Sequence, residues 1–299
     1  VDKETMETVE NFGISCEDTI GTGPYKVTEW VVNDHYTLEY NDKYWGEAPS
    51  VKKMIVSIIP DPSTQNLMYQ NGELDILDLE SLDSTIVEAT YKTQYADKLI
   101  SCSRVGLTYF ALNENNPFLK DVNVRKAIRY AINIPLISSN VYMGMTLDSD
   151  AMVPSNSWLY DDSLESTFVY NPDMARQLLE EDGWTDLDNE GPLDKIVNGE
   201  VKHLYLQLIT YEDPDNDVRY ETANLIEEML AEVGIGISKT TAVSYQDMQN
   251  RLQSGSYELA LCAFQMDVVP DYGFMLRKGN TGNYMRYVSN DMTALIDQL

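Results

Sequence analysis

Asp267 is the residue whose position in this sequence points most directly to chemistry. It follows the apolar run 257–263 through the segment Phe264-Gln265-Met266. That run is typical of a strand at the end of an alternating strand–helix pattern, and in such folds ligands bind beyond the carboxyl ends of the strands. A carboxylate at that place could pair with a cationic group of a ligand. The alternative is a loop aspartate that caps a turn before Pro270.

The elements that would position Asp267 run from residue 203 to residue 263. Leu204, Leu206 and Leu208 alternate as in a strand, and a helix follows whose apolar face includes Ile226 and Leu230. We then expect a strand at 235–243, a helix at 245–253 and the strand at 257–263. This alternation predicts an α/β fold with a parallel sheet and right-handed crossovers.

The preceding part of the chain changes character near residues 110–116. Before this point the patterns predict mainly strands, at 25–32, 35–40, 54–59, 74–77 and 107–112, with a short helix at 63–70. After it, helices become prominent. Asp121 or Asn123 can cap one helix, and Asn171-Pro172 begins another that ends at Gly183. We therefore place a domain boundary after residue 112.

Three side chains beside Asp267 are candidates for the wall of a pocket. Gln265 and Met266 precede it directly, and Tyr272 follows five residues later. Trp158 and Tyr160, after the turn 154–157, could also line a pocket through their aromatic faces. For each of these residues the alternative is ordinary packing.

Metal binding is not predicted. The stretch 186–191 has acids at its first, third and fifth positions and Gly191 at its sixth, like the start of a calcium loop. The twelfth position is Val197 in place of a bidentate glutamate, so an acidic turn is the better interpretation. The two histidines, His35 and His203, lie in predicted strands without a partner at metal-ligand spacing. No cofactor is expected.

Composition excludes several classes of function. The chain has 49 acidic and 21 basic residues, a net charge of -28, which disfavours nucleic acid and anionic lipid as partners. No nucleophile or metalloprotease motif is present. The three cysteines form no C-x-x-C pair, and a bridge between Cys16 and Cys102 stays open. No apolar stretch could span a membrane, and both ends look like cut boundaries.

Several segments in order resemble the solute-binding proteins of ABC importers, the oligopeptide, dipeptide and nickel family. They are Gly21-Thr22-Gly23-Pro24-Tyr25, Asn41 to Gly46, Phe110-Ala111-Leu112-Asn113, Val124 to Ile128, Tyr170-Asn171-Pro172-Asp173 and Leu259 to Met275. The resemblance covers essentially the whole chain.

This resemblance implies a periplasmic-binding-protein-like clamp of the large three-domain type, with two lobes joined by crossing strands. Residues 1–112 would form part of the first lobe and 113–299 the second, without its C-terminal return. Tyr109 would lie on a crossing strand and face the ligand cleft. In peptide-binding relatives an aspartate three residues after an aromatic pairs with the ligand's α-amino group, which matches Asp267. Phe264 stands where those relatives often carry tryptophan.

The implied function is the substrate-binding component of an ABC importer, not an enzyme. It would be an exported monomer, lipid-anchored through an upstream segment, that captures short peptides by lobe closure and delivers them to a membrane permease. Oligosaccharide or chelated nickel are alternative ligands for the same fold. A hydrolase and a surface adhesion or sensing module are alternatives of another class.

Overall fold

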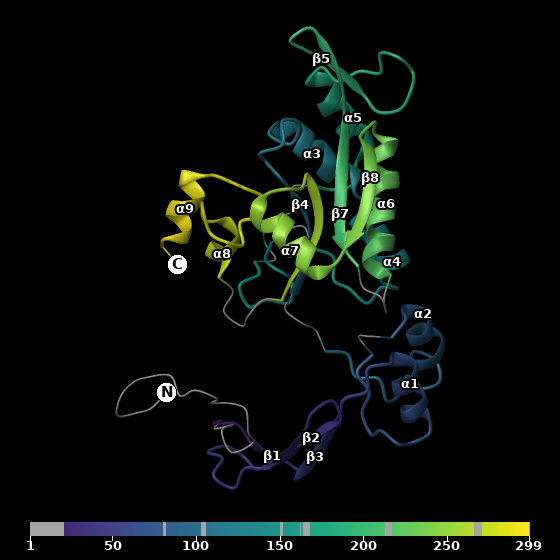
Figure 1. The fold of residues 1–299 in the computed structure, drawn as a ribbon, viewed down its shortest axis with the longest axis vertical. Helices are drawn as coiled ribbons and strands as arrows, with labels where there is room; N and C mark the ends of the chain where they lie inside the picture. Colours follow the sequence, from purple (N-terminus) through teal and green to yellow (C-terminus); the bar gives the residue numbers. More distant parts are fainter. Residues whose placement is uncertain are drawn as a thin grey trace. The chain divides into compact units, whose positions relative to one another are not determined.

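The computed structural model describes residues 21–79, 82–102, 106–149, 152–161, 163, 168–212, 217–265 and 271–298. The chain divides into two compact units, Val1–Leu82 (unit 1) and Asp83–Leu299 (unit 2) (Figure 1). Among the described residues, no helix combines the length with the apolar character that a membrane crossing requires.

Unit 1 contains a three-stranded antiparallel sheet. Strand β2 (His35–Tyr40) is central and pairs with β1 (Tyr25–Val31) on one side and β3 (Lys53–Ser57) on the other. The alternating residues of the sequence therefore form strands, as predicted. Leu38 of the central strand lies opposite Val27 of β1 and Met54 of β3, so these three side chains form an apolar row on one face of the sheet.

Helix α1 (Pro62–Gln70) follows this sheet and begins with a capped turn. The carboxylate of Asp61 accepts a hydrogen bond from the Thr64 N–H at 2.8 Å, as an N-cap does. The strand expected at 74–77 is wrong, because these residues pair with no strand and Ile76 is 85% exposed. A short apolar run forms a strand only where a partner strand is available.

Unit 2 is built on a four-stranded mixed sheet. Its order is β4 (Gly106–Leu112), β9 (Leu259–Gln265), β7 (Tyr205–Tyr211) and β8 (Gly236–Val243). β7 is parallel to both β8 and β9, whereas β4 is antiparallel to β9. The predicted α/β fold with parallel strands is confirmed, and the strand order places β9 between β4 and β7.

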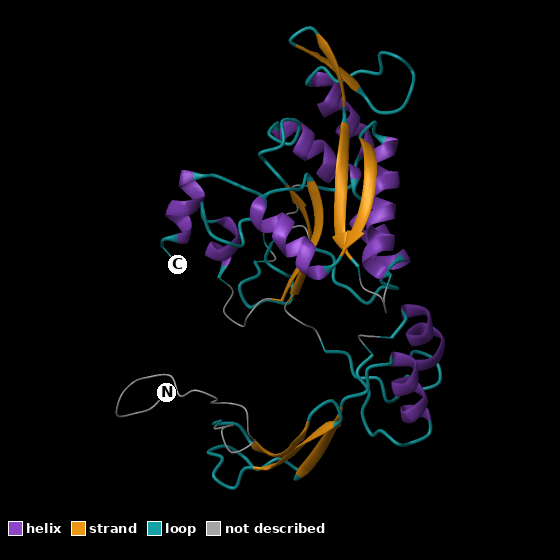
Figure 2. Ribbon diagram, viewed as in Figure 1, coloured by secondary structure: helices purple, strands orange, loops and turns teal. Residues whose placement is uncertain are grey.

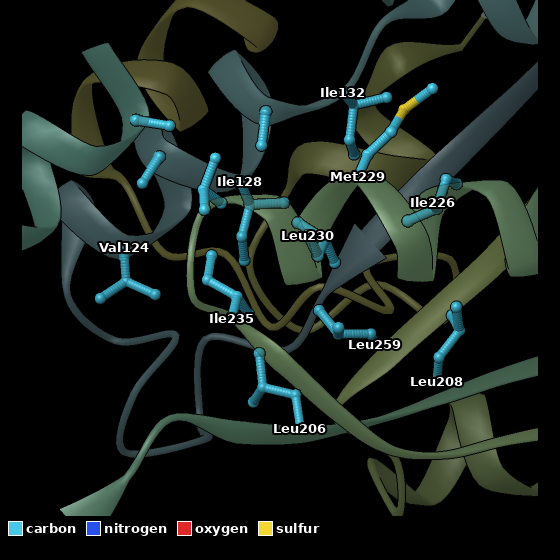
Figure 3. Close-up of a cluster of buried hydrophobic side chains, with 14 of the residues drawn as sticks. Val124, Ile128, Ile132, Leu206, Leu208, Ile226, Met229, Leu230, Ile235 and Leu259 are labelled. Atoms are coloured by element: carbon cyan, nitrogen blue, oxygen red, sulfur yellow. The ribbon is translucent and has the colours of Figure 1, made fainter. Parts of the chain in front are cut away.

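Helices cover both faces of this sheet (Figure 2), and its central strands β7 and β9 have buried residues on both sides. Successive residues of β9 alternate between the faces: Leu259 and Leu261 belong to one core cluster, Ala260 and Cys262 to the other. The larger cluster joins the sheet to α3, α5 and α6 (Figure 3), and its labelled members are Val124, Ile128, Ile132, Leu206, Leu208, Ile226, Met229, Leu230, Ile235 and Leu259.

Two of the helices of unit 2 illustrate polar caps that the sequence shows. Asp121 accepts from the Asn123 N–H at 2.8 Å at the start of α3, and Asn171 accepts from the Met174 N–H at 3.0 Å at the start of α5. The elements are α2 (Ser84–Ile86), the π-helix η2 (Val87–Tyr91), α3 (Val122–Ala131), α4 (Ile134–Asn140), α5 (Pro172–Glu181), α6 (Val218–Glu232), α7 (Tyr245–Ser254), α8 (Tyr272–Leu276) and α9 (Asn290–Ile296).

A separate antiparallel hairpin precedes β7. It consists of β5 (Asp194–Val197) and β6 (Glu200–His203), joined by Asn198 and Gly199 in left-handed conformations with φ of 53° and 81°. Asn-Gly is the dipeptide that such a two-residue turn favours. Figure 1 shows the hairpin beyond the amino end of β7, at the end of the sheet opposite the carboxyl ends of β7 and β8.

The compact units do not divide where the sequence changes character. The division falls after Leu82, and β4, which we expected in the first lobe, pairs along its whole length with β9 of unit 2. Backbone pairing with a strand far along the chain places β4 there. The lobe boundary after residue 112 stays a prediction.

Candidate functional site

The carboxyl ends of the three parallel strands meet at one edge of the unit 2 sheet, which we call the carboxyl edge. β7 ends at Tyr211, β8 at Val243 and β9 at Gln265. The first residue of β4, Gly106, lies opposite Gln265 because these strands are antiparallel. In open α/β sheets this is the edge at which ligands bind.

Arg219 brings a positive charge to the carboxyl edge. It lies in the first turn of α6, and its guanidinium is 4.1 Å from the ring centroid of Tyr211. Tyr211 in turn meets Tyr245 edge to face, with centroids 6.0 Å apart. No carboxylate of the described residues is ion-paired with this half-buried arginine. Its charge is therefore free to bind an anionic group of a ligand.

Sequence reasoning missed Arg219. The apolar periodicity predicted a helix only from Ala223, whereas α6 begins at Val218. Asp217, directly before that start, is a residue type that favours helix amino ends. Beginning the helix there would have placed Arg219 at the carboxyl edge.

An acidic residue, Glu212, lies at the same edge. Glu212 follows β7 directly, is exposed, and its N–H donates to the carbonyl of Val243 at 2.8 Å. Asp267 and Met266, which the sequence predicts to contact the ligand, lie outside the described residues. Their part in ligand binding stays a prediction.

An aromatic layer holds the end of β9. The ring of Phe264 is stacked on Tyr109 of β4 at 5.4 Å and on Tyr284 at 6.0 Å, and it meets Phe274 of α8 edge to face at 5.6 Å. Phe264 precedes the segment 266–270 and Phe274 follows it. The layer therefore fixes both flanks of the segment that contains Asp267.

Tyr109 contributes its hydroxyl as well as its ring to this packing. The hydroxyl is hydrogen-bonded to the Cys262 thiol, and burial raises the pKa of Tyr109 well above its usual range. Burial also raises the pKa of Cys262 to about 12, although the Tyr109 hydrogen bond and the charge of Arg219 act in the opposite direction. Both groups are therefore neutral at physiological pH. The predicted ligand contact of Tyr109 stays a prediction.

The other predicted pocket residues are placed but not joined into one wall. Gln265 is exposed at the end of β9, and Tyr272 is half-buried at the start of α8. Trp158 is 68% exposed and Tyr160 41% exposed. An exposed tryptophan offers a stacking surface to a ligand.

Both histidines are hydrogen-bonded to carboxylates. In His35, Nδ1 lies 2.6 Å from Asp34 Oδ2 and Nε2 lies 3.4 Å from Glu29 Oε2. In His203, Nδ1 lies 2.6 Å from Asp194 Oδ1. The His35 ring thus contacts a carboxylate through each of its nitrogens, and the His203 ring contacts one through Nδ1.

Comparison with known proteins decides the family. The family model for "Bacterial extracellular solute-binding proteins, family 5 Middle" matches residues 8–285. The chain belongs to this family.

Relatives and solved structures of these solute-binding proteins agree with that assignment. Oligopeptide-binding protein AppA of Bacillus subtilis is 27% identical over 290 residues, which cover 93% of this chain and 50% of AppA. Heme-binding protein A of Haemophilus influenzae is 24% identical over 286 residues, covering 93% and 48%. The crystal structure of NikA from Brucella suis in complex with Fe(III)-EDTA superimposes with a TM-score of 0.76 at 23% identity, covering 93% of this chain and 56% of NikA.

The fold is thus that of the periplasmic-binding-protein-like solute-binding proteins, as the sequence resemblance implied. The chain spans about half the length of the curated relatives that it matches. Among the described residues, the carboxyl edge of this chain carries the cation Arg219 and the anion Glu212.

A hollow of about 390 Å³ lies away from the carboxyl edge. Its wall contains Phe118 and Trp184, which meet edge to face at 5.5 Å, and Lys195, whose ammonium is ion-paired with Asp182 at 2.8 Å. It borders the β5–β6 hairpin. Asp121 and Lys202 also line this hollow, so its acidic and basic side chains balance and it has no excess of either charge.

Proposed function

We propose that this protein is the substrate-binding component of an ABC importer that captures short peptides. Family membership supports a solute-binding role, and the observation that carries the peptide proposal is the free charge of Arg219 at the carboxyl edge. A short peptide is a zwitterion, with an ammonium at one end and a carboxylate at the other. It needs a cation and an anion on the protein.

The carboxyl edge supplies both signs of charge. Arg219 can receive the peptide carboxylate through a planar guanidinium that forms two parallel hydrogen bonds. Asp267, two residues after β9 in the sequence, can receive the α-amino group, and Glu212, which follows β7, is a second acid. The exposed rings of Trp158 and Tyr160 can pack against peptide side chains.

Capture would proceed without covalent change. The two lobes close around the extended peptide, the closed form docks on a membrane permease, and the peptide is released there. The protein acts outside the cytoplasm, held near the permease by a lipid anchor or free in the periplasm. Water exclusion on closure strengthens each charge pair, because the local dielectric falls.

Calorimetry with one tripeptide in three forms tests this proposal. The free tripeptide is titrated first, then its N-acetylated form and its C-amidated form. We expect each modification to weaken binding about tenfold or more, because each leaves one protein charge unpaired. If all three forms bind equally, the ends of the peptide are not recognised. If none binds, peptide is the wrong ligand.

A metal chelate is the second candidate ligand. NikA is described in complex with Fe(III)-EDTA, and NikZ from Campylobacter jejuni in complex with Ni(L-His). Such complexes also carry carboxylates that Arg219 could bind. Titration with the preformed nickel–histidine complex, with nickel alone as the control, separates this candidate from peptide, because a chelate site binds the complex and not the free ion.

A further inference from the structure

Three side chains around the β5–β6 hairpin bring metal-binding atoms to one point. One donor atom each from Asp188, Asp194 and His203 lies within 4.8 Å of the others. Asp194 and His203 are direct partners across the hairpin, and Asp188 comes from the turn before it. The donors therefore converge because β5 pairs with β6, and the Asn198-Gly199 turn sets that register.

The two carboxylates are close together with little to offset their charge. Asp194 is 1% exposed; its Oδ2 accepts from the Leu187 N–H at 3.2 Å and its Oδ1 contacts His203. Asp188 Oδ1 accepts from the Glu190 N–H at 2.9 Å. Among the described residues, no lysine or arginine is ion-paired with either aspartate. Asp194 is buried although Asp188 is exposed, so water screens the repulsion less than between two exposed carboxylates, and a divalent cation between the oxygens would offset it.

We propose that Asp188, Asp194 and His203 bind a divalent transition-metal ion, with Zn²⁺ as the best fit. One imidazole nitrogen and two carboxylate oxygens are a donor set that Zn²⁺ accepts, whereas Ca²⁺ takes oxygen donors. The calcium-like stretch 186–191 still lacks an acid at Val197, so the histidine replaces that ligand and changes the metal class.

The site can adjust to an ion. Donors of a tetrahedral zinc ion lie roughly 3.3 Å apart, so the 2.6 Å contact between His203 and Asp194 must lengthen. The His203 side chain is 48% exposed at the end of β6, which gives its ring room to move, and Asp188 is exposed too. Water can complete the coordination from the open side.

The ion would join the turn at 186–191 to the hairpin, at the end of the sheet opposite the carboxyl edge. Its role is structural, independent of solute capture. His35 provides a natural contrast, because its two acids, Asp34 and Glu29, contact opposite nitrogens of the ring and do not converge.

Titration of chelator-treated protein with ZnCl₂ tests the site. By calorimetry we expect one saturable ion per chain, and by thermal unfolding a Tm that rises with Zn²⁺. His203→Gln and Asp188→Asn should each weaken the affinity at least about tenfold. The exposed positions of both side chains make these variants suitable, whereas Asp194→Asn alters a buried group.

Matched controls are His35→Gln and Glu190→Gln, which should leave the affinity unchanged. Cu²⁺ bound to the wild type should show nitrogen hyperfine coupling that His203→Gln removes. The proposal is overturned if no saturable Zn²⁺ binding occurs, or if His35→Gln weakens it as much as His203→Gln. It is also overturned if CaCl₂ raises the Tm and His203→Gln makes no difference.

Discussion

The rings of Tyr109 and Phe264 lie parallel, 5.4 Å apart with an angle of 2° between their planes. They come from β4 and β9, neighbouring strands whose residues are far apart in the sequence. Phe264 also stacks on Tyr284, so three rings form one layer at the end of β9. Such stacking adds to the stability that burial of the rings provides.

Phe264→Ala should destabilise the protein by about 2 kcal/mol, because it removes a partly buried ring from this layer. Urea unfolding measures the change. Trp158→Ala, at a side chain that is 68% exposed, is the control and should cost less than about 0.5 kcal/mol. An equal, small effect of both substitutions would show that the layer does not contribute to stability.

Arg219→Gln should weaken binding of a peptide with a free carboxylate by about tenfold or more. The C-amidated peptide, which has no carboxylate to lose, should bind the variant as it binds the wild type. Calorimetry of both peptides measures this. Lys239→Gln, at an exposed cation on β8, is the control and should change neither affinity. Arg219 has no role in recognition if the variant loses both peptides equally.

His35 should make stability depend on pH. Hydrogen bonds to Asp34, and secondly to Glu29, raise the pKa of His35 above 6.5. A pKa that is higher in the folded than in the unfolded state stabilises the protein below pH 6.5, and this contribution disappears as pH rises through the folded pKa.

Chemical unfolding at pH 5.5 and at pH 8.5 measures this dependence. We expect His35→Gln to lower stability more at the acid pH. Asp34→Asn should bring the pKa of His35, followed by NMR, back toward 6.5. A His35→Gln effect that is the same at both pH values would contradict the linkage.

Cys262 should resist alkylation in the folded protein, because it is 5% exposed and burial raises its pKa to about 12. Cys102 is an exposed, free thiol and should react at pH 8. Peptide mapping by mass spectrometry after iodoacetamide treatment distinguishes the two. Urea should make Cys262 react as well. Rapid modification of both thiols without urea would show that the β9 core opens readily.

The sequence by itself determined the local elements. Periodicity predicted the strands β7, β8 and β9 and the helices between them. Caps such as Asp121 and Asn171 predicted where helices begin. These signals suffice because they depend on residues within one or two turns. The strand predicted at 74–77 is wrong, because local hydrophobicity does not tell whether a partner strand exists. The Asn198-Gly199 dipeptide, which turns β5 into β6, is likewise a local signal.

Only the tertiary structure decided which distant residues share a site. β9 lies between β4 and β7, which brings Tyr109 against Phe264, and no local pattern contains that order. In the same way, the pairing of β5 with β6 sets His203 beside Asp194. The physical reason is that strand pairing depends on backbone hydrogen bonds and side-chain packing between segments that are remote in the chain. Residue types and spacing limit those pairings, and the packed core selects one of them.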